Sequence, residues 1–177
     1  MEKLIHNLDK QYGLSVISGD NDAEQPYLEK IFSVNSTLHF NQTPESKLKY
    51  INDLQAKYKK VMMVGDGLND AGALKQSNVG IAVSDEVNNF SPACDAILDG
   101  TQLNRLGVFI KFAKAGKAIV VASFIISILY NFVGLSFAVQ GILSPVIAAI
   151  LMPASSLTII LFTMGTSSLV ARFWGMR

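Results

Sequence analysis

Two patterns of hydrophobic and polar residues divide the chain. Up to about residue 100, short apolar runs alternate with amphipathic stretches. Between Lys117 and Arg172, by contrast, the chain has no Asp, Glu, Lys, Arg or His. A bilayer core of about 30 Å needs roughly 20 apolar helical residues. The uncharged stretch therefore predicts two membrane spans, residues 118–140 and 146–171, joined by a turn that contains Gly141 and Pro145. The alternative is a helical hairpin buried in a soluble core.

The first half predicts an α/β domain. A helix is expected from Pro44 to Tyr58, with Thr43 as its N-cap and Pro44 in the first turn. Alternation of strands and helices indicates a parallel sheet, whose chemistry lies beyond the carboxyl ends of the strands. The apolar runs predict strands at residues 14–18, 60–64, 79–83 and 96–98, the second of them buried.

Charge indicates how the chain is oriented. All fourteen acidic residues lie in the first half, and the loop between the spans is uncharged. The positive-inside rule places both termini in the cytosol, because lysines precede the first span and arginines follow the second. The single Cys94 allows no disulfide within the chain and agrees with a cytosolic domain. We expect a multi-pass protein of the plasma (inner) membrane, in contact with lipid and with no nucleic-acid partner.

Four segments follow from these patterns. The predicted boundaries are 1–100 for part of a cytosolic domain, 101–117 for a cytosolic helical connection, 118–171 for a transmembrane hairpin and 172–177 for a cytosolic tail.

One glycine-rich turn carries the strongest chemical pattern. Asp66 follows the second predicted strand directly and Asp70 comes four residues later, while Gly65 and Gly67 allow a sharp turn close to a ligand. Mg²⁺ favours oxygen ligands and is held by one or two carboxylates together with water and phosphate. Asn69 can donate hydrogen bonds to the carboxylates or the phosphate. The alternative is a polar turn in which Asp70 is only a helix N-cap.

The run from Val64 to Leu74 resembles the signature of the P-type ATPases, which belong to the haloacid dehalogenase-like superfamily. It departs from many members at Gly72, where they have proline. The resemblance implies a partial haloacid dehalogenase-like (Rossmann-like) parallel-sheet domain followed by two transmembrane helices. It also implies Mg²⁺ at Asp66 and Asp70, and ATP as the phosphoryl donor.

Two further motifs precede this run in the expected order. Ser18, Gly19 and Asp20 stand at a strand end and resemble the motif whose hydroxyl binds the phosphoryl oxygens. Lys47 resembles the lysine that neutralises the phosphoaspartate. Taken alone, a strand-end serine is an ordinary turn residue and a helix lysine is an ordinary solvated one. The alternative in which residues 20–22 form an Asp-x-Asp nucleophile pair leaves no such motif before Lys47.

The nucleophile of that family is absent from this sequence, which has no Asp-Lys-Thr-Gly-Thr run. The nucleotide-binding and actuator regions are missing as well. The strand that carries the nucleophile is central in this fold, so we expect an incomplete sheet. We also expect that the chain alone does not hydrolyse ATP. The remainder of the ATPase is therefore an expected partner.

Polar residues inside a membrane span are candidates for function. Tyr130 and Asn131 lie in the first span, and Met152, Ser155 and Ser156 share one helix face in the second. At about 1.5 Å per residue, Asn131 and Ser155 lie roughly 14 and 16 Å from the loop, so the two groups can meet. A thioether beside neutral oxygen and amide groups suits copper(I).

These intramembrane residues resemble those of the copper(I) group of heavy-metal ATPases, which implies a copper(I) exporter with a copper chaperone as a candidate partner. The Cys-Pro-Cys helix of that group is absent. The serines can instead be packing residues and the methionine a core filler. Two further alternatives are a membrane-anchored phosphatase of the same superfamily and an inactive truncated fragment.

Overall fold

The structure, a computed structural model, describes residues 1–57, 59–66, 69–84, 94–142 and 144–176. The chain divides into two compact units, Met1–Gly107 and Val108–Arg177. The first contains short parallel strands and helices, and the second contains long apolar helices. This arrangement confirms the predicted fold class.

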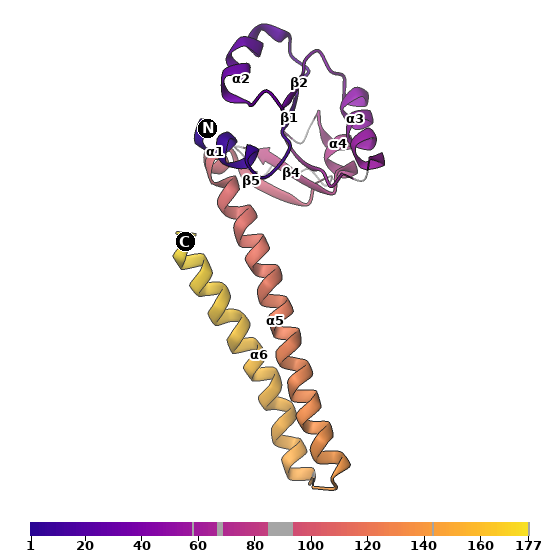
Figure 1. The fold of residues 1–177 in the computed structure, drawn as a ribbon, viewed down its shortest axis with the longest axis vertical. Helices are drawn as coiled ribbons and strands as arrows, with labels where there is room; N and C mark the ends of the chain where they lie inside the picture. The colour runs from indigo at the N-terminus through magenta and orange to yellow at the C-terminus, as the bar shows by residue number, and fades with distance from the viewer. Residues whose placement is uncertain (58, 67–68, 85–93, 143, 177) are drawn as a thin grey trace. The chain divides into compact units, whose positions relative to one another are not determined.

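The first unit alternates helices with strands, as its apolar runs predict (Figure 1). All four predicted strands are present. Sequence patterns missed β2, α1 and α2, which are short elements without a fully buried residue. The elements are α1 (Glu2–Asp9), β1 (Ser15–Ile17), η1 (Asp22–Glu24), α2 (Gln25–Ile31), β2 (Thr37–His39), α3 (Pro44–Ala56), β3 (Met62–Gly65), α4 (Ala71–Gln76), β4 (Val79–Ser84), β5 (Ala96–Asp99) and η2 (Gly100–Arg105).

The strands form two separate parallel sheets. One pairs β1 with β2, with Val16 opposite Leu38, and the other has the order β3-β4-β5. The prediction of a buried strand at residues 60–64 was wrong: Met62 is 43% and Val64 is 38% exposed. The exposed residues alternate with the half-buried Met63 and Gly65, so one face of this outer strand is left uncovered. Two small sheets in place of one agree with the expectation that a central strand is missing.

The core of this unit lies where α4 packs between α3 and β4. Leu74 in α4 is completely buried, and Ile51 from α3 and Ala82 from β4 are nearly so. Burial of a leucine side chain contributes about 2 kcal/mol to folding. Gly80 permits the close approach, because a Cβ there would lie 2.5 Å from the carbonyl oxygen of Leu74.

The start of α3 is fixed by its own sequence. The Thr43 hydroxyl accepts a hydrogen bond from the Ser46 amide at 3.2 Å, and Pro44 occupies the first helical position. The backbone N–H of Glu45, and then the Thr43 hydroxyl, lower the pKa of the Glu45 carboxyl by hydrogen bonding to its charged form. This cap places Lys47 on the first full turn of the helix.

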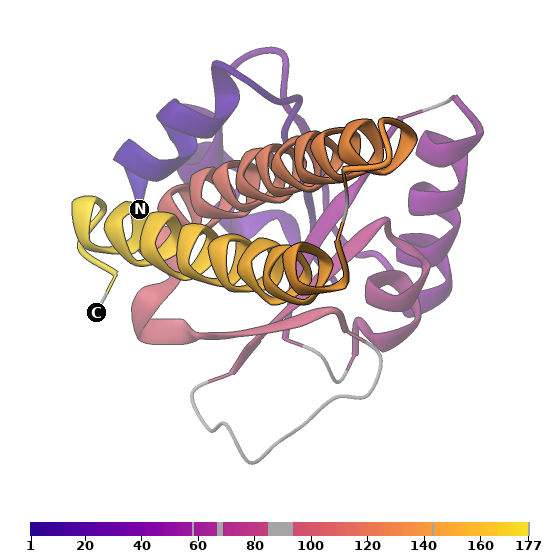
Figure 2. The same ribbon diagram turned by 90° about the horizontal axis from the view of Figure 1, so that it is seen from below.

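The second unit is formed by α5 (Leu106–Val139) and α6 (Pro145–Phe173), which run side by side in Figures 1 and 2. The predicted turn is present, with Gly141 at φ 71° and Ser144 capping α6. The predicted connection at 101–117 is helical: it begins in η2 and continues directly into the first span as α5.

Both long helices are apolar and long enough to cross a membrane, and the rest of the described chain covers neither apolar window. The alternative of a hairpin buried in a soluble core is therefore not supported. At the end opposite the turn, Phe112 and Trp174 meet edge to face with ring centroids 6.5 Å apart, which ties α5 to α6.

The N-cap of α3 can be tested with Thr43→Ala. Loss of the cap is expected to destabilise α3 by about 1 kcal/mol, which corresponds to roughly fivefold faster amide exchange. Hydrogen–deuterium exchange of residues 44–56 in the detergent-solubilised chain measures this. Thr43→Ser retains the hydroxyl and should exchange like the wild type; equal protection in both variants would contradict the assignment.

Candidate functional site

The centre of the first candidate site is an ion pair between Lys47 and Asp70. The Lys47 ammonium donates to Asp70 Oδ1 at 2.7 Å, and the two side chains are only 11% and 12% exposed. A charge removed from water to this extent needs a close partner of opposite sign. The pair connects α3 to the turn after β3, so the sequence-predicted lysine and the second aspartate of the motif do come together.

Asp70 stands at the N-cap position of α4 but does not act as the cap. Its side chain accepts no capping hydrogen bond from the helix, because its carboxylate is turned toward Lys47. The alternative in which Asp70 serves only as an N-cap is therefore not supported.

Gly65 makes room for this carboxylate. A Cβ at that position would lie 2.5 Å from Asp70 Oδ2, closer than such atoms approach, and 3.0 Å from Asp70 Cβ, a tight contact. Gly65 belongs to the strand β3, so its backbone is extended as for other residues. A glycine is needed here for space and not for an unusual backbone conformation. The other glycine predicted to allow close approach, Gly67, lies outside the described residues, as does Leu68.

Asp66 is exposed at the end of β3 and accepts a hydrogen bond from the backbone amide of Asn69 at 3.3 Å. Asn69 was predicted to donate through its side chain, and the structure shows its main chain in that role. No group of three or more His, Cys, Asp or Glu side chains gathers in the described ranges. A cation here would be held by Asp66 and Asp70 with water and phosphate, which fits Mg²⁺.

The Ser18 motif forms a compact turn at the carboxyl end of β1. The Asp20 amide donates to Ser18 Oγ at 3.1 Å, and the Ser18 hydroxyl donates to the Asp20 carboxylate at 3.3 Å. A Cβ at Gly19 would lie 3.3 Å from the carbonyl oxygen of Gln42. The structure therefore orders a hydroxyl and a carboxylate at a strand end.

The residues after this turn argue against a nucleophile pair. The Asn21 side chain accepts from the Ala23 amide and caps η1, so Asp20 and Asp22 flank a helix start. This is the ordinary behaviour of asparagine at a turn.

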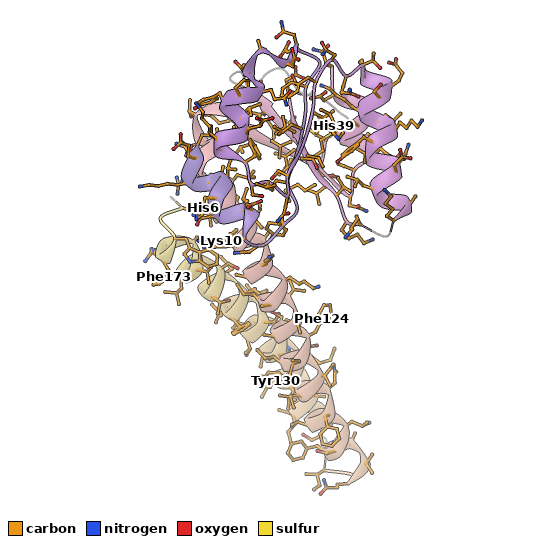
Figure 3. All side chains as sticks on the ribbon, turned by 45° about the horizontal axis from the view of Figure 1, so that its top comes forward. His6, Lys10, His39, Phe124, Tyr130 and Phe173 are labelled. Carbon is orange, nitrogen blue, oxygen red and sulfur yellow. The ribbon has the colours of Figure 1, made fainter. Side chains whose placement is uncertain are left out.

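The second candidate site is a hollow of about 360 Å³ between α5 and α6. Figure 3 shows Tyr130 on α5, partway along this pair of helices. Four of the five predicted membrane residues line the hollow; Ser156 does not, and its hydroxyl lies 3.5 Å from the Met152 carbonyl oxygen. The lining consists of Tyr130, Asn131, Gly134, Leu135, Ala138, Ala148, Leu151, Met152 and Ser155.

Two polar side chains that line the hollow each donate a hydrogen to the helix backbone. The Asn131 amide nitrogen donates to the Ser127 carbonyl at 3.1 Å, and the Ser155 hydroxyl donates to the Met152 carbonyl at 2.8 Å. Such back-bonding is common for serine in helices. Oxygen lone pairs and a thioether then remain for a ligand, which is the chemistry of a cation site without fixed charge.

The hollow is open. Met152 is 74% exposed, and Asn131 is exposed as well. Pro153 lies inside α6 and cannot donate to the Ala149 carbonyl one turn earlier, so this acceptor also lacks its helical partner. A cation here would need further ligands from outside the described chain.

Sequence reasoning missed the small residues that shape the hollow. Gly134 and Ala138 follow Tyr130 at steps of four, and Ala148 precedes Met152 by the same step. Helical spacing places each set on one face. That spacing is the signal that could have found them, although glycine and alanine carry no chemistry of their own.

Comparison with known proteins found similarity to one family model and to curated P-type ATPases. The family described as haloacid dehalogenase-like hydrolase matches residues 2–78. A probable copper-importing P-type ATPase A of Enterococcus hirae is 33% identical over 155 residues, which are 86% of this chain and 21% of the relative. A copper-exporting P-type ATPase of Staphylococcus saprophyticus is 30% identical over 158 residues, 89% of this chain and 20% of the relative.

A solved structure shares the fold along nearly the whole chain. The crystal structure of a zinc-transporting PIB-type ATPase in the E2.Pi state matches with a TM-score of 0.66 and 23% identity, over 99% of this chain and 27% of that one. The chain spans about a fifth of the length of the two copper-ATPase relatives named above.

The space at Gly65 can be tested with Gly65→Ala. The added methyl group would displace Asp70 from Lys47, with an expected cost of about 2 kcal/mol, or roughly 30-fold faster exchange of the α4 amides. The matched control is Gly72→Ala in α4, where nothing lies within 4 Å and alanine favours the helix. Equal protection in the two variants would contradict the assignment.

The ion pair can be tested by a double-mutant cycle. Lys47→Met leaves the Asp70 carboxylate without its partner and should cost about 3 kcal/mol, seen as much faster exchange across α4. Asp70→Asn should behave similarly. The double variant K47M/D70N should lose far less than the sum; strict additivity would show that the two side chains act independently.

Proposed function

Since the chain belongs to the heavy-metal P-type ATPases, we propose that it forms one part of an ATP-driven pump that exports copper(I) through an aspartyl-phosphate intermediate. The observation that carries this proposal is the hollow between α5 and α6. It presents a thioether and uncharged oxygen acceptors within an apolar helix pair. A soft monovalent cation suits such a set of ligands better than a hard divalent one.

The first unit would contribute the phosphoryl side of the reaction. Asp66 and Asp70 would hold Mg²⁺, which neutralises charge on the transferring phosphoryl group when bound. Lys47 fixes the Asp70 carboxylate and brings a positive charge to the same turn. The Ser18 hydroxyl could donate to a phosphoryl oxygen once its hydrogen turns away from the Asp20 carboxylate. The nucleophilic aspartate and most of the ATP site would come from the remainder of the ATPase.

The second unit would contribute part of the metal path. Tyr130, Asn131, Met152 and Ser155 are the proposed ligands, with Ser156 as a neighbour whose oxygen is close to the Met152 carbonyl. The exposure of Met152 supports a shared site, completed by another membrane helix. We retain the predicted segments, with 118–171 as the membrane hairpin and 101–117 and 172–177 on the cytosolic side.

The direction of transport and the partners belong to the same proposal. The names of the two relatives cited above differ, one importing and one exporting copper. Export is proposed for this chain, from the cytosol across the plasma membrane, with both termini cytosolic by the positive-inside rule. A cytosolic copper chaperone is the proposed donor of the ion. An inactive metal-binding fragment is the second candidate, favoured by the absent nucleophile.

A chimera tests the proposal. The matching C-terminal fifth of the Enterococcus hirae relative is replaced by this chain, and copper(I)-stimulated ATP hydrolysis is measured in proteoliposomes. Stimulation is expected. Asn131→Ala and Met152→Leu should weaken the apparent copper(I) affinity by at least about tenfold, because each removes a proposed ligand. Ser168→Ala, outside the hollow, is the matched control.

Other results would decide against the proposal. Unchanged copper stimulation in both Asn131→Ala and Met152→Leu would remove the hollow from the transport path. The chain alone, incubated with ATP and Mg²⁺, should form no phosphoenzyme. If phosphoenzyme does form, the chain contains its own nucleophile and the phosphatase alternative gains.

A further inference from the structure

One hydroxyl pair joins the two membrane helices next to the hollow. The Tyr130 hydroxyl in α5 lies 3.1 Å from Thr158 Oγ1 in α6. Distance alone does not say which of the two oxygens is the donor. Thr158 does not line the hollow, and sequence reasoning did not single it out.

A second hydrogen bond settles the direction. Thr158 Oγ1 also donates to the Ala154 carbonyl at 2.8 Å. A threonine hydroxyl has a single hydrogen and two lone pairs. Since that hydrogen is engaged with the backbone, Thr158 can only accept from Tyr130. The tyrosine hydrogen therefore points at Thr158.

The consequence concerns what Tyr130 offers to a cation. A phenol with a free hydrogen could turn it into the hollow, where it would repel a positive ion. Because its hydrogen is held by Thr158, the Tyr130 hydroxyl oxygen presents only lone pairs to the hollow. Asn131 and Ser155 show a similar arrangement, since each donates a hydrogen to the backbone.

We propose that Thr158 is a positioning residue for the metal site: it holds the Tyr130 hydroxyl in the orientation that makes Tyr130 an oxygen ligand for a soft monovalent cation such as copper(I). This role rests on the proposed function, because it requires a cation in the hollow. Thr158 itself does not touch the ion.

Because the hollow needs further ligands, copper(I) binding is measured on the chimera with the Enterococcus hirae relative, in detergent micelles under reducing, oxygen-free conditions and in a Cys94→Ser background. Copper(I) affinity is measured by competition with a chromophoric chelator, and Met152→Leu defines which copper(I) belongs to the hollow. Loss of an outer partner that orients a metal ligand weakens metal binding by about tenfold or more. We expect this loss for Thr158→Val, which has nearly the same shape as threonine but no acceptor.

Two variants separate orientation from packing. Thr158→Ser retains the hydroxyl and should restore the wild-type affinity. Thr163→Val is the matched control, since the Thr163 hydroxyl donates to the backbone of its own helix, and it should leave the affinity unchanged. Tyr130→Phe should weaken binding, and adding Thr158→Val to it should weaken binding no further.

A spectroscopic readout keeps the two proposals distinguishable. The tyrosine Raman doublet reports whether a phenol donates or accepts, and the difference between wild type and Tyr130→Phe isolates Tyr130 among the five tyrosines. Thr158→Val should remove the donor signature. If Thr158→Val leaves the Tyr130 Raman signal unchanged, the positioning role of Thr158 is overturned and the metal site is not. The same holds if Thr158→Val keeps the wild-type copper(I) affinity while Tyr130→Phe weakens it. If the wild-type chain shows the donor signature but Met152→Leu leaves copper(I) binding by the chimera unchanged, the proposed metal site is overturned, and the positioning role with it.

Discussion

The ion pair between Lys47 and Asp70 is the interaction around which the first unit is organised. An ammonium and a carboxylate that are both largely shielded from water must meet, because either one alone would cost several kcal/mol. That requirement explains the neighbouring sequence. Thr43 starts α3 at the residue that brings Lys47 to the turn, and Gly65 leaves the space in which the Asp70 carboxylate lies. The fold and the candidate chemistry therefore depend on the same contact.

The membrane unit applies the same physical logic without charge. In the first unit, a fixed positive charge orients a carboxylate; in the second, backbone carbonyls engage the hydrogens of Asn131, Ser155 and Thr158. Each arrangement sets the direction of the polar groups before a ligand arrives. Preorganised groups need no rearrangement when charge develops or a cation enters. This shared feature is what makes both places credible as sites, beyond the identity of their residues.

The limits of sequence reasoning follow from distance along the chain. The uncharged run, the Thr43 cap and the strand ending at Gly65 are local patterns, and the structure confirms them. The pairing of Lys47 with Asp70 joins residues 23 positions apart, and no local pattern encodes it. The exposure of Met62 was missed because an apolar run does not say whether both faces of a strand are covered. Thr158 was missed because its role depends on a hydrogen that only the geometry of two helices assigns.

Incompleteness appears independently in each unit. The strands form two small parallel sheets, and Met62 and Val64 remain exposed on one face of β3. In the membrane unit, Met152 lines an open hollow and is 74% exposed. Apolar strand residues are costly to leave in water, and an open cation site lacks ligands. Both features are expected if the chain folds against further segments of the pump proposed above, because such segments would cover the open face of β3 and supply further ligands to the hollow.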